Sequence, residues 1–358
     1  MSSWALRLRT AGACVRAFCR PGVPAHAVLF VTGRCNAACG HCFSAGVLDK
    51  GEELRLEEYA QVAASMGPLV QVVFSGGEPF LRGDLPEIAA LFYSLCRPAV
   101  FSVPTNGASP ESILEAAGRM AQACPKARFN FLVSLDGLSS VHDRLRGRTG
   151  LFDSALETLR GLQRLSLSEK NVRALASTAV LAENLEAIEP LSGFLSREFG
   201  PEGPLQVLQL DERAQCALYR EEGLLERARA VLERSSRARR LSGPVRRGLA
   251  RMFIDGPNRW VLERTAPARR PVSCGAGQRS VVILPDGSVF PCEPFAFSSL
   301  GGGGRAPKLR DFQWDMQAVL GSCAYRQMAR EVRCCARPCA WSCAGSLDLL
   351  YSPWRRAF

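Results

Sequence analysis

Short apolar runs alternate with longer amphipathic segments between about residues 27 and 210. A short apolar run bounded by turn residues predicts a buried strand, whereas apolar residues three or four positions apart predict a helix that covers a sheet. Predicted strands cover residues 27–31, 70–74, 99–103, 129–135, 172–181 and 205–210. Predicted helices cover residues 54–66, 110–124, 153–165 and 184–198, and a further helix begins at a predicted capping box of Asp84 and Glu87.

This alternation implies six β/α units in series, and therefore a parallel sheet with right-handed crossovers. Periodicity alone does not distinguish a barrel-like sheet from a doubly wound one. The polar motifs of the chain follow directly after predicted strands, which is where barrel-like α/β proteins build their sites. We therefore expect a functional site at the carboxyl edge of the sheet.

Three cysteines follow the first predicted strand in a C-x3-C-x2-C pattern: Cys35, Cys39 and Cys42. A cubic [4Fe–4S] cluster has four irons, so three thiolates from one loop leave one iron open to a small molecule. Zinc is the alternative, but a structural zinc site takes four ligands, and His41 inside the motif is poorly placed to turn round as the fourth. The spacing favours a cluster over zinc.

A second motif follows the next predicted strand, where Ser75 leads into Gly76, Gly77, Glu78 and Pro79. Paired glycines let a backbone approach a ligand closely, and a glutamate offers an acceptor to an ammonium group. A turn of this kind says little by itself. It gains meaning from the cysteine motif that precedes it.

Together the two motifs resemble the radical S-adenosylmethionine (AdoMet) superfamily, or radical SAM superfamily. The resemblance implies that the three cysteines hold a [4Fe–4S] cluster whose open iron is chelated by AdoMet. It also implies that the methionine end of AdoMet binds to Gly76, Gly77, Glu78 and Pro79. The implied fold is α/β: a partial (β/α)6 TIM-like barrel, open on one side, with a small C-terminal cysteine-rich auxiliary-cluster domain.

A third region fits the same resemblance, after the fourth predicted strand. Ser134 ends that strand and Arg146 lies downstream of it, in a region where the superfamily often places a serine and an arginine at the AdoMet ribose or carboxylate. The resemblance therefore implies that Ser134 and Arg146 contact AdoMet. The alternative is that Asp136 opens an ordinary turn and that Arg144, Arg146 and Arg148 form a solvated basic loop.

The C-terminal region carries a second set of cysteines. Cys274 and Cys292 flank two short apolar runs that are joined through Asp286 and Gly287. An Asp-Gly pair between such runs predicts a β-hairpin, which would bring the two cysteines close together.

This region resembles the auxiliary-cluster extension of radical SAM enzymes, called SPASM in its long form and twitch in its short form. The adjacent pair Cys334 and Cys335, and the lack of a cysteine after Cys343, depart from the long form. The resemblance therefore implies one auxiliary [4Fe–4S] cluster, with zinc as the alternative metal. Its implied ligands are Cys274, Cys292 and two of Cys335, Cys339 and Cys343.

The expected domains are an N-terminal extension, a radical SAM core, an arginine-rich linker and a SPASM/twitch-like iron–sulfur domain, at residues 1–26, 27–233, 234–271 and 272–358. Free cysteine is a common buried residue. We therefore expect buried thiols without a metal at Cys14, Cys19, Cys96, Cys124 and Cys323.

The chain has 358 residues, of which 47% are hydrophobic, enough for a large and a smaller domain with a well-buried core. Its net charge of +11 favours acidic partners without choosing among them. With three histidines, a histidine-based metal centre or a Ser-His-Asp triad is not expected. The chain carries no P-loop and no dinucleotide-binding glycine motif, so phosphoryl and hydride transfer are not expected either.

Arginines interrupt each apolar run before residue 33, so no secretory signal is predicted. The chain has no run of about 18 apolar residues, so no membrane span is predicted. Iron–sulfur chemistry also needs reduced thiols. We therefore expect a cytoplasmic protein that binds no nucleic acid and receives electrons from a donor such as flavodoxin or ferredoxin.

The resemblance implies reductive cleavage of AdoMet to a 5′-deoxyadenosyl radical, which abstracts hydrogen from a peptide or small molecule for oxidation or cross-linking. An alternative within the superfamily is a dehydrogenase of a sugar-like alcohol, or an epimerase. A remoter alternative is a non-catalytic, metal-stapled protein that binds nucleic acid. Cys216 is a candidate hydrogen-atom donor and Asp211 a candidate base, although a packed thiol and a helix start explain them as well.

Overall fold

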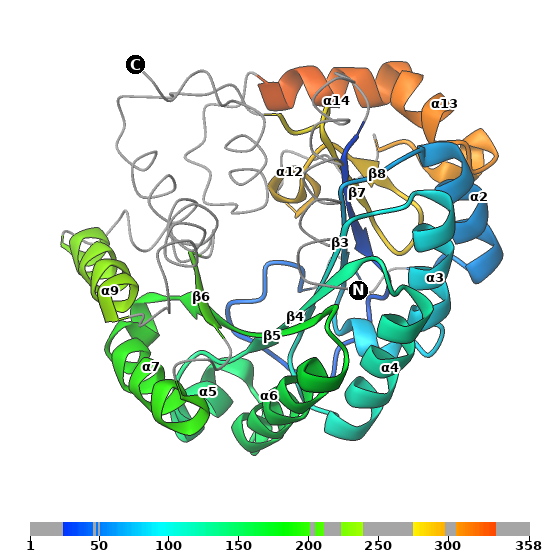
Figure 1. Cartoon of the computed structure of the whole chain (residues 1–358). Coiled ribbons are helices and arrows are strands. Elements are labelled where there is room, and N and C mark those ends of the chain that lie inside the picture. Colours follow the sequence, from blue (N-terminus) through cyan, green and yellow to red (C-terminus); the bar gives the residue numbers. More distant parts are fainter. Residues whose placement is uncertain are drawn as a thin grey trace.

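A computed structural model describes a curved, mostly parallel sheet with helices along its convex side (Figure 1). It describes residues 24–45, 48, 51–200, 205–210, 223–238, 275–297 and 306–333. The sheet has eight strands in the order β6-β5-β4-β3-β2-β1-β7-β8. The six strands of the parallel series are β1 (His26–Phe30), β2 (Gln71–Ser75), β3 (Val100–Thr105), β4 (Arg128–Ser134), β5 (Val172–Val180) and β6 (Leu205–Leu210).

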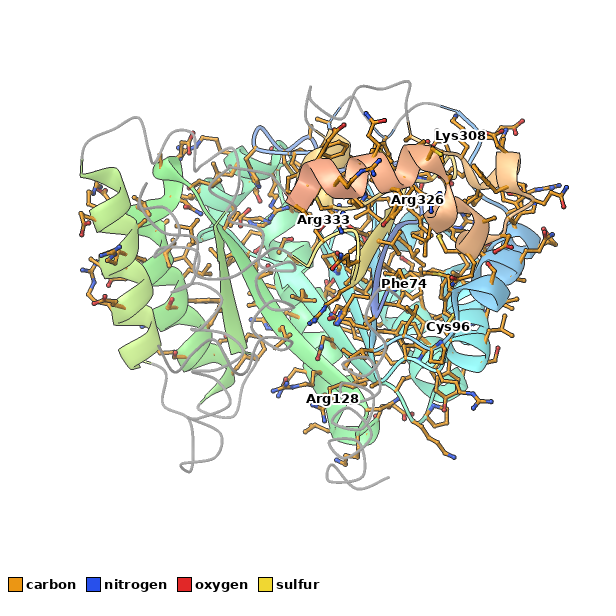
Figure 2. All side chains as sticks on the ribbon, turned by 90° about the horizontal axis from the view of Figure 1, so that it is seen from above. Phe74, Cys96, Arg128, Lys308, Arg326 and Arg333 are labelled. Atoms are coloured by element: carbon orange, nitrogen blue, oxygen red, sulfur yellow. The ribbon has the colours of Figure 1, made fainter. Side chains whose placement is uncertain are left out.

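The main outer helices join successive strands. They are α2 (Leu56–Met66), α3 (Leu85–Leu95), α4 (Pro110–Ala123), α6 (Leu151–Ser168), α7 (Leu185–Phe199) and α9 (Leu224–Ala238). Apolar side chains from the sheet and from these helices form one core, in which Phe74 on β2 and Cys96 after α3 are fully buried (Figure 2). Burial of alternate residues along β4 fits a sheet that is packed on its outer face and more open on its inner face.

All six predicted parallel strands are present, each shifted by at most a residue or two. The strand order places β1 and β6 far apart, so the sheet does not close, and the predicted partial barrel is confirmed. After β4, where the alternative interpretation expects a turn and a solvated basic loop, the chain forms a short helix, α5 (Ser139–Arg146). No helix in the described ranges is both long and apolar enough to cross a membrane.

The predicted C-terminal hairpin is also present. Its strands β7 (Ser280–Ile283) and β8 (Val289–Phe290) are antiparallel, and Gly287 in the turn adopts a positive φ of 81°. Strand β7 pairs in parallel with β1, with Ser280 opposite His26, so the hairpin extends the barrel sheet instead of standing apart from it. The remaining elements are α12 (Glu293–Phe297), α13 (Met316–Gly321) and α14 (Cys323–Arg333), with 3-10 turns at Pro79–Leu81, Ala182–Asn184 and Leu309–Phe312.

Two local predictions were wrong. Helix α3 does begin after Asp84, but the Asp84 carboxylate accepts hydrogen bonds from Arg82 at 2.7 and 3.0 Å and does not cap the helix. Arg82 is buried and needs a counter-ion, so it takes the carboxylate that the capping box would use. Cys96 and Cys124 are buried as expected, whereas Cys323 is exposed at the first position of α14.

Other predictions fall outside the part of the chain that the structure describes. These are the burial of Cys14 and Cys19 and most of the arginine-rich segment 234–271. Helix α9 continues past residue 233, where the radical SAM core domain was expected to end. The domain limits therefore stay predictions.

Candidate active site

The cysteine motif forms a loop at the carboxyl end of β1, clamped by the end of α5. The amides of Ala38 and Gly40 donate to the carbonyls of Arg146 and Leu145, at 3.0 and 3.3 Å. Gly147 makes this contact possible, since a Cβ there would lie 2.3 Å from the Ala38 carbonyl oxygen. The loop is therefore held by a helix more than a hundred residues away in sequence.

Two cysteine sulfurs have a polar hydrogen-bond donor beside them from a different β/α unit. Arg146 Nη1 lies 3.8 Å from Cys39 Sγ, and Asn106 Nδ2 lies 3.9 Å from Cys35 Sγ. Asn106 also donates to the side-chain oxygen of Asn36 at 2.7 Å, which fixes its amide over the loop. Donors of this kind stabilise a thiolate, the form in which cysteine binds metal.

The thiols influence one another. Burial raises the pKa of Cys39, the positive charge of Arg146 offsets part of that rise, and negative charge on Cys42 or Cys35 raises it further. The three sulfurs therefore share one electrostatic environment. Loading a metal must displace their protons, so the donors beside them favour the metal-bound form.

The donor set fits a [4Fe–4S] cluster. In such a cluster each thiolate binds a different iron, so the cysteines need not converge on a single point. Within the described ranges, no three side chains of His, Cys, Asp or Glu are gathered closely enough to hold one metal ion. His41 does not turn toward the motif, and its Nε2 instead lies 3.7 Å from Asp136 Oδ2.

The glycine turn is built against the chain that leads into the cysteine loop. A Cβ at Gly76 would lie 2.4 Å from the carbonyl oxygen of Thr32, and a Cβ at Gly77 would lie 2.2 Å from that of Arg34. The amides of Gly77 and Glu78 donate to these same carbonyls at 2.9 and 2.8 Å. The glycines thus allow close approach of two backbone segments, so the turn and the cysteine loop are positioned together.

Glu78 joins this turn to the end of β3. Its carboxylate accepts hydrogen bonds from the hydroxyl of Thr105 at 2.8 Å and from the amides of Asn106 and Phe80 at 2.7 and 3.2 Å. Burial raises its pKa to about 7, although these donors and Arg146 act in the opposite direction. A carboxylate has about four lone-pair sites, so Glu78 keeps capacity for one more donor. Pro79, which is buried, begins the 3-10 turn that follows.

The alternative of a solvated basic loop is wrong for Arg146. Its side chain is 14% exposed, and Nε donates to Asp136 Oδ2 at 2.6 Å. Arg144 and Arg148 are exposed, and Arg148 donates to the carbonyl of Asn36 at 2.8 Å. Ser134 is half-buried at the end of β4, two positions before Asp136.

Sequence reasoning missed the importance of Asp136. This residue is fully buried, and its other carboxylate oxygen accepts a hydrogen bond from the amide of Ala179 at 2.8 Å. Burial acts to raise its pKa, but Arg146, His41 and His142 outweigh burial, so the pKa lies below the usual range. Asn106 follows β3 directly and Asp136 follows β4 after one residue, and this position at the carboxyl ends of strands is the signal in the sequence that could have indicated them.

Among the predicted auxiliary ligands, Cys292 is the one that the structure describes. It is half-buried after β8, and the strand register places it near the start of β1, at the edge opposite the cysteine loop. The other predicted ligands and catalytic candidates lie outside the described residues: Cys274, Cys335, Cys339, Cys343, Asp211 and Cys216.

An aromatic cluster connects the two cysteine regions. Phe43 directly follows Cys42, and Phe297 ends α12, the helix that directly follows Cys292. The ring of Phe297 lies 5.2 Å from that of Phe43 and 5.0 Å from that of Phe30, both edge to face. The cysteine loop therefore packs on α12 as well as on α5.

Comparison with known proteins agrees with this geometry. The profile of the radical SAM superfamily matches residues 29–194. Fe-coproporphyrin III synthase of Methanosarcina barkeri (strain Fusaro / DSM 804) is 33% identical over 220 residues, which cover 57% of this chain and 51% of that protein. The antilisterial bacteriocin subtilosin biosynthesis protein AlbA of Bacillus subtilis (strain 168) is 24% identical over 278 residues, covering 76% and 56%.

The chain spans about half the length of these two curated relatives. Among solved structures, Streptococcus suis SuiB bound to precursor peptide SuiA matches with a TM-score of 0.59 at 15% identity, over 90% of this chain and 70% of that chain. A likeness at this identity shows the shared fold. The matched profile contains the cysteine loop, the glycine turn and Arg146, so this part of the chain is similar to the radical SAM superfamily.

Proposed function

We propose that this chain is an enzyme that reductively cleaves AdoMet and uses the resulting 5′-deoxyadenosyl radical to abstract hydrogen from its substrate. The superfamily uses a [4Fe–4S] cluster and AdoMet, and the bound cluster supplies the electron for this cleavage. The observation that supports the proposal is the cysteine loop, held by α5 with Arg146 beside Cys39 and Asn106 beside Cys35.

The cluster ligands in this proposal are Cys35, Cys39 and Cys42. The residues proposed to bind AdoMet are Gly76, Gly77, Glu78, Pro79, Ser134 and Arg146. Glu78 keeps acceptor capacity for an ammonium group, and Arg146 places a positive charge beside the cluster loop. The protein then has to hold the substrate near the radical and exclude water.

An auxiliary [4Fe–4S] cluster, bound by Cys274, Cys292 and two of Cys335, Cys339 and Cys343, is part of the proposal. The packing of α12, which directly follows Cys292, against the cysteine loop supports a structural link between the two cluster regions. Such a cluster would accept an electron from a substrate radical and complete a two-electron oxidation. Cys216 and Asp211 remain candidates for a hydrogen-atom donor and a base, and a flavodoxin or ferredoxin for the electron donor.

Two classes of substrate are candidates for this enzyme. A peptide is supported by the shared fold with SuiB, which was solved with a precursor peptide, and by the similarity to AlbA, a bacteriocin biosynthesis protein. A small molecule is the second candidate, and the 33% identity to Fe-coproporphyrin III synthase favours it. Deuterium transfer from labelled candidate substrates into 5′-deoxyadenosine would identify the class that reacts.

Anaerobic reconstitution tests the proposed cofactors. The wild-type chain should hold about seven to eight irons, by four per cluster, and should form 5′-deoxyadenosine from AdoMet after reduction with dithionite. Cys39→Ala should abolish this cleavage, because it removes a ligand of the first cluster. Cys292→Ala should lose about four irons and keep some cleavage that is uncoupled from substrate.

Cys323→Ser is the matched control, because Cys323 is an exposed thiol outside both proposed ligand sets. Its iron content and cleavage rate should equal those of the wild type. Formation of 5′-deoxyadenosine by the Cys39→Ala variant would contradict the proposed ligands. Zinc without iron in the purified protein would favour a metal-stapled binding protein instead.

A further inference from the structure

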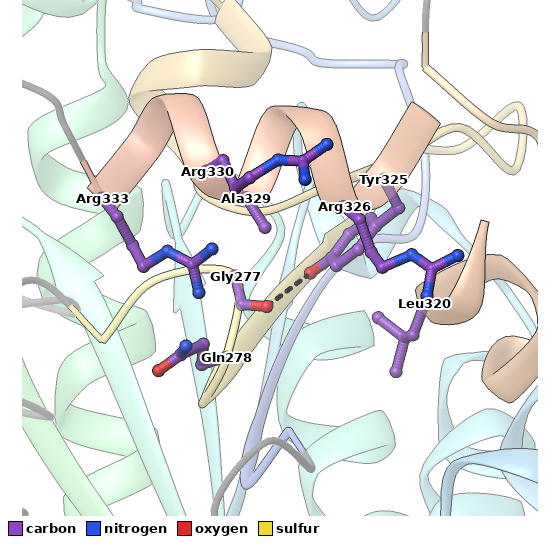
Figure 3. A pocket seen from close by; sticks show the side chains of 8 residues that line it. All are labelled: Gly277, Gln278, Leu320, Tyr325, Arg326, Ala329, Arg330 and Arg333. Carbon is purple, nitrogen blue, oxygen red and sulfur yellow. Dashed lines mark hydrogen bonds between the residues drawn. The ribbon is translucent and has the colours of Figure 1, made fainter. Parts of the chain in front are cut away.

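A hollow of about 240 Å³ lies between α14 and the turn before β7. Figure 3 shows its lining, with Arg333 and Arg326 toward the two ends and Gln278 and Leu320 below them. The turn belongs to the edge of the sheet where β1 starts, because Ser280 pairs with His26. The cysteine loop follows the other end of β1, so this hollow is separate from the proposed AdoMet site.

The frame of the hollow is rigidly built. Gly277 adopts a positive φ of 77°, and its amide donates to the Pro291 carbonyl at 3.0 Å. The carbonyl of Gly277 accepts a hydrogen bond from the hydroxyl of Tyr325 at 3.4 Å, and a Cβ at Gly277 would lie 3.0 Å from the Cβ of Ala329. Helix α14 is therefore held against the turn, and its outer side chains start from fixed positions.

Three exposed arginines on α14 line this hollow, namely Arg326, Arg330 and Arg333. We call these three residues the arginine row. Within the described ranges none of them forms an ion pair with a carboxylate, and Glu331, the one acidic residue of α14, accepts a hydrogen bond from Gln327. Some exposed arginines elsewhere have glutamate partners, whereas Arg144, Arg164 and Arg197 have no ion pair with a described carboxylate. Exposed arginines that pair with a glutamate include Arg119, Arg160 and Arg227. The arginine row differs from single unpaired arginines in placing three such charges along one hollow.

The helix dipole does not account for the arginine row. Arg330 and Arg333 lie in the last turn of α14, where a cation is favourable. Arg326 lies in the first turn, where a cation is unfavourable. A bound anion would compensate for all three charges, and the net charge of +11 shows that the chain has no surplus of its own carboxylates.

The spacing of the row indicates the shape of that anion. At 1.5 Å of rise per residue, Arg326 and Arg333 are about 10 Å apart along the helix axis, which is too far for one phosphate group. In an extended peptide, side chains at alternate positions point the same way and lie about 7 Å apart. Carboxylates at alternate positions can therefore reach successive guanidinium groups of the row.

We propose that the arginine row binds an extended acidic peptide segment, with aspartate or glutamate side chains at alternate positions. The hollow beside Gln278 and Leu320 receives part of that segment. The arginine row lies at the edge of the sheet away from the cysteine loop, and it gives the chain a docking surface outside the proposed AdoMet site. Binding and radical formation can therefore fail independently.

The test uses the full chain, purified without oxygen, and fluorescence anisotropy at low ionic strength. The probe is a labelled synthetic peptide of alternating glutamate and serine, and the matched peptide has glutamine in place of glutamate. The variant carries Arg326→Gln, Arg330→Gln and Arg333→Gln. The control carries the same charge change at exposed arginines outside the hollow, as Arg119→Gln, Arg164→Gln and Arg197→Gln.

The wild type and the control should bind the glutamate peptide saturably, and neither should bind the glutamine peptide. The α14 variant should bind about tenfold more weakly, as expected for three exposed charge pairs. All three proteins should show the same thermal midpoint, because the substituted side chains are exposed. Added salt should weaken binding to the wild type.

Equal affinity of the α14 variant and the wild type would overturn the proposal, as would an equal loss in the control. Displacement of the peptide by an equal concentration of inorganic phosphate would show a phosphate site instead. Tighter binding of a single-stranded oligonucleotide of equal charge, lost in the α14 variant, would show a nucleic-acid surface. Either outcome would also overturn the proposal.

Discussion

At the scale of single residues, the cysteine loop depends on a buried charge pair that does not itself belong to the loop. Asp136 is fully buried and holds Arg146 at 2.6 Å, and Arg146 in turn lies beside Cys39. His142 accepts a hydrogen bond from the Asp136 amide through Nδ1, and burial lowers the His142 pKa to about 4. The aspartate is therefore the anionic partner that keeps Arg146 in place.

Replacing Asp136 with asparagine should destabilise the protein by about 3 kcal/mol, because a guanidinium would remain buried without its counter-ion. Urea unfolding of the metal-free protein measures this change. Asp286→Asn is the control, because its partner Lys308 is exposed, and the loss there should stay below about 1 kcal/mol. An equal loss of unfolding free energy in the two variants would show that the buried Asp136–Arg146 pair stabilises the protein no more than the exposed pair does.

Gly77 is the second residue whose replacement has a clear geometric consequence. Gly77→Ala puts a Cβ 2.2 Å from the Arg34 carbonyl oxygen, so the glycine turn and the cysteine loop must separate. We expect a loss of about 2 kcal/mol in unfolding free energy and weaker AdoMet binding in equilibrium dialysis.

Gly83→Ala serves as its control, because a Cβ there meets no atom within 4 Å. It should bind AdoMet as the wild type does. Wild-type AdoMet binding by Gly77→Ala would contradict the view that this close approach shapes the site.

At the scale of elements, the cysteine loop is held from two sides. Helix α5 binds its backbone, and α12 packs on it through Phe297, Phe43 and Phe30. Each aromatic pair of this kind contributes about 0.5–1.5 kcal/mol beyond its buried area. Because α12 directly follows Cys292, a change at the predicted auxiliary site should reach the cysteine loop through this packing.

Phe297→Ala should loosen the cysteine loop, because it removes both ring contacts of α12 with Phe43 and Phe30. Thiol labelling of Cys42 in the metal-free protein, followed by mass spectrometry, should become several times faster, as a loss of about 1 kcal/mol implies. Phe199→Ala, at the far end of α7, should leave the labelling rate unchanged. Unchanged labelling in Phe297→Ala would mean that α12 does not order the loop.

At the scale of the whole molecule, stability should depend on pH through a histidine at the base of the sheet. His26 begins β1, and burial lowers its pKa to about 3, although a hydrogen bond with Gln71 acts in the opposite direction. In the unfolded chain the His26 side chain takes up a proton near pH 6.5, whereas in the folded chain it does so only at a much lower pH. The stability that His26 contributes is therefore complete above pH 6.5 and is lost as the pH falls toward 3.

Between about pH 7.5 and 5.5 the wild type should lose about 1.4 kcal/mol more stability than His26→Gln, from the proton that the unfolded state takes up. Urea unfolding at the two pH values gives this difference. Other groups that titrate in this range, such as Glu78 and His142, contribute to both proteins and cancel. Identical pH dependence in the two proteins would contradict a buried, neutral His26.

The sequence by itself determined the order of the β/α units and the places of the two motifs. Apolar periodicity and turn residues are local signals, so they located all six parallel strands and the hairpin around Gly287. The C-x3-C-x2-C spacing and the Gly76-Gly77 turn are local as well. These features were therefore sufficient to indicate the superfamily.

Tertiary structure decided which distant side chains meet. The contact of Arg146 with Asp136 and Cys39, the capture of Asp84 by Arg82 and the pairing of β7 with β1 all depend on packing and strand register. The arginine row over Gly277 depends on how α14 packs against the hairpin. Spacing along a chain does not encode such contacts, because they join segments that only the folded core brings together.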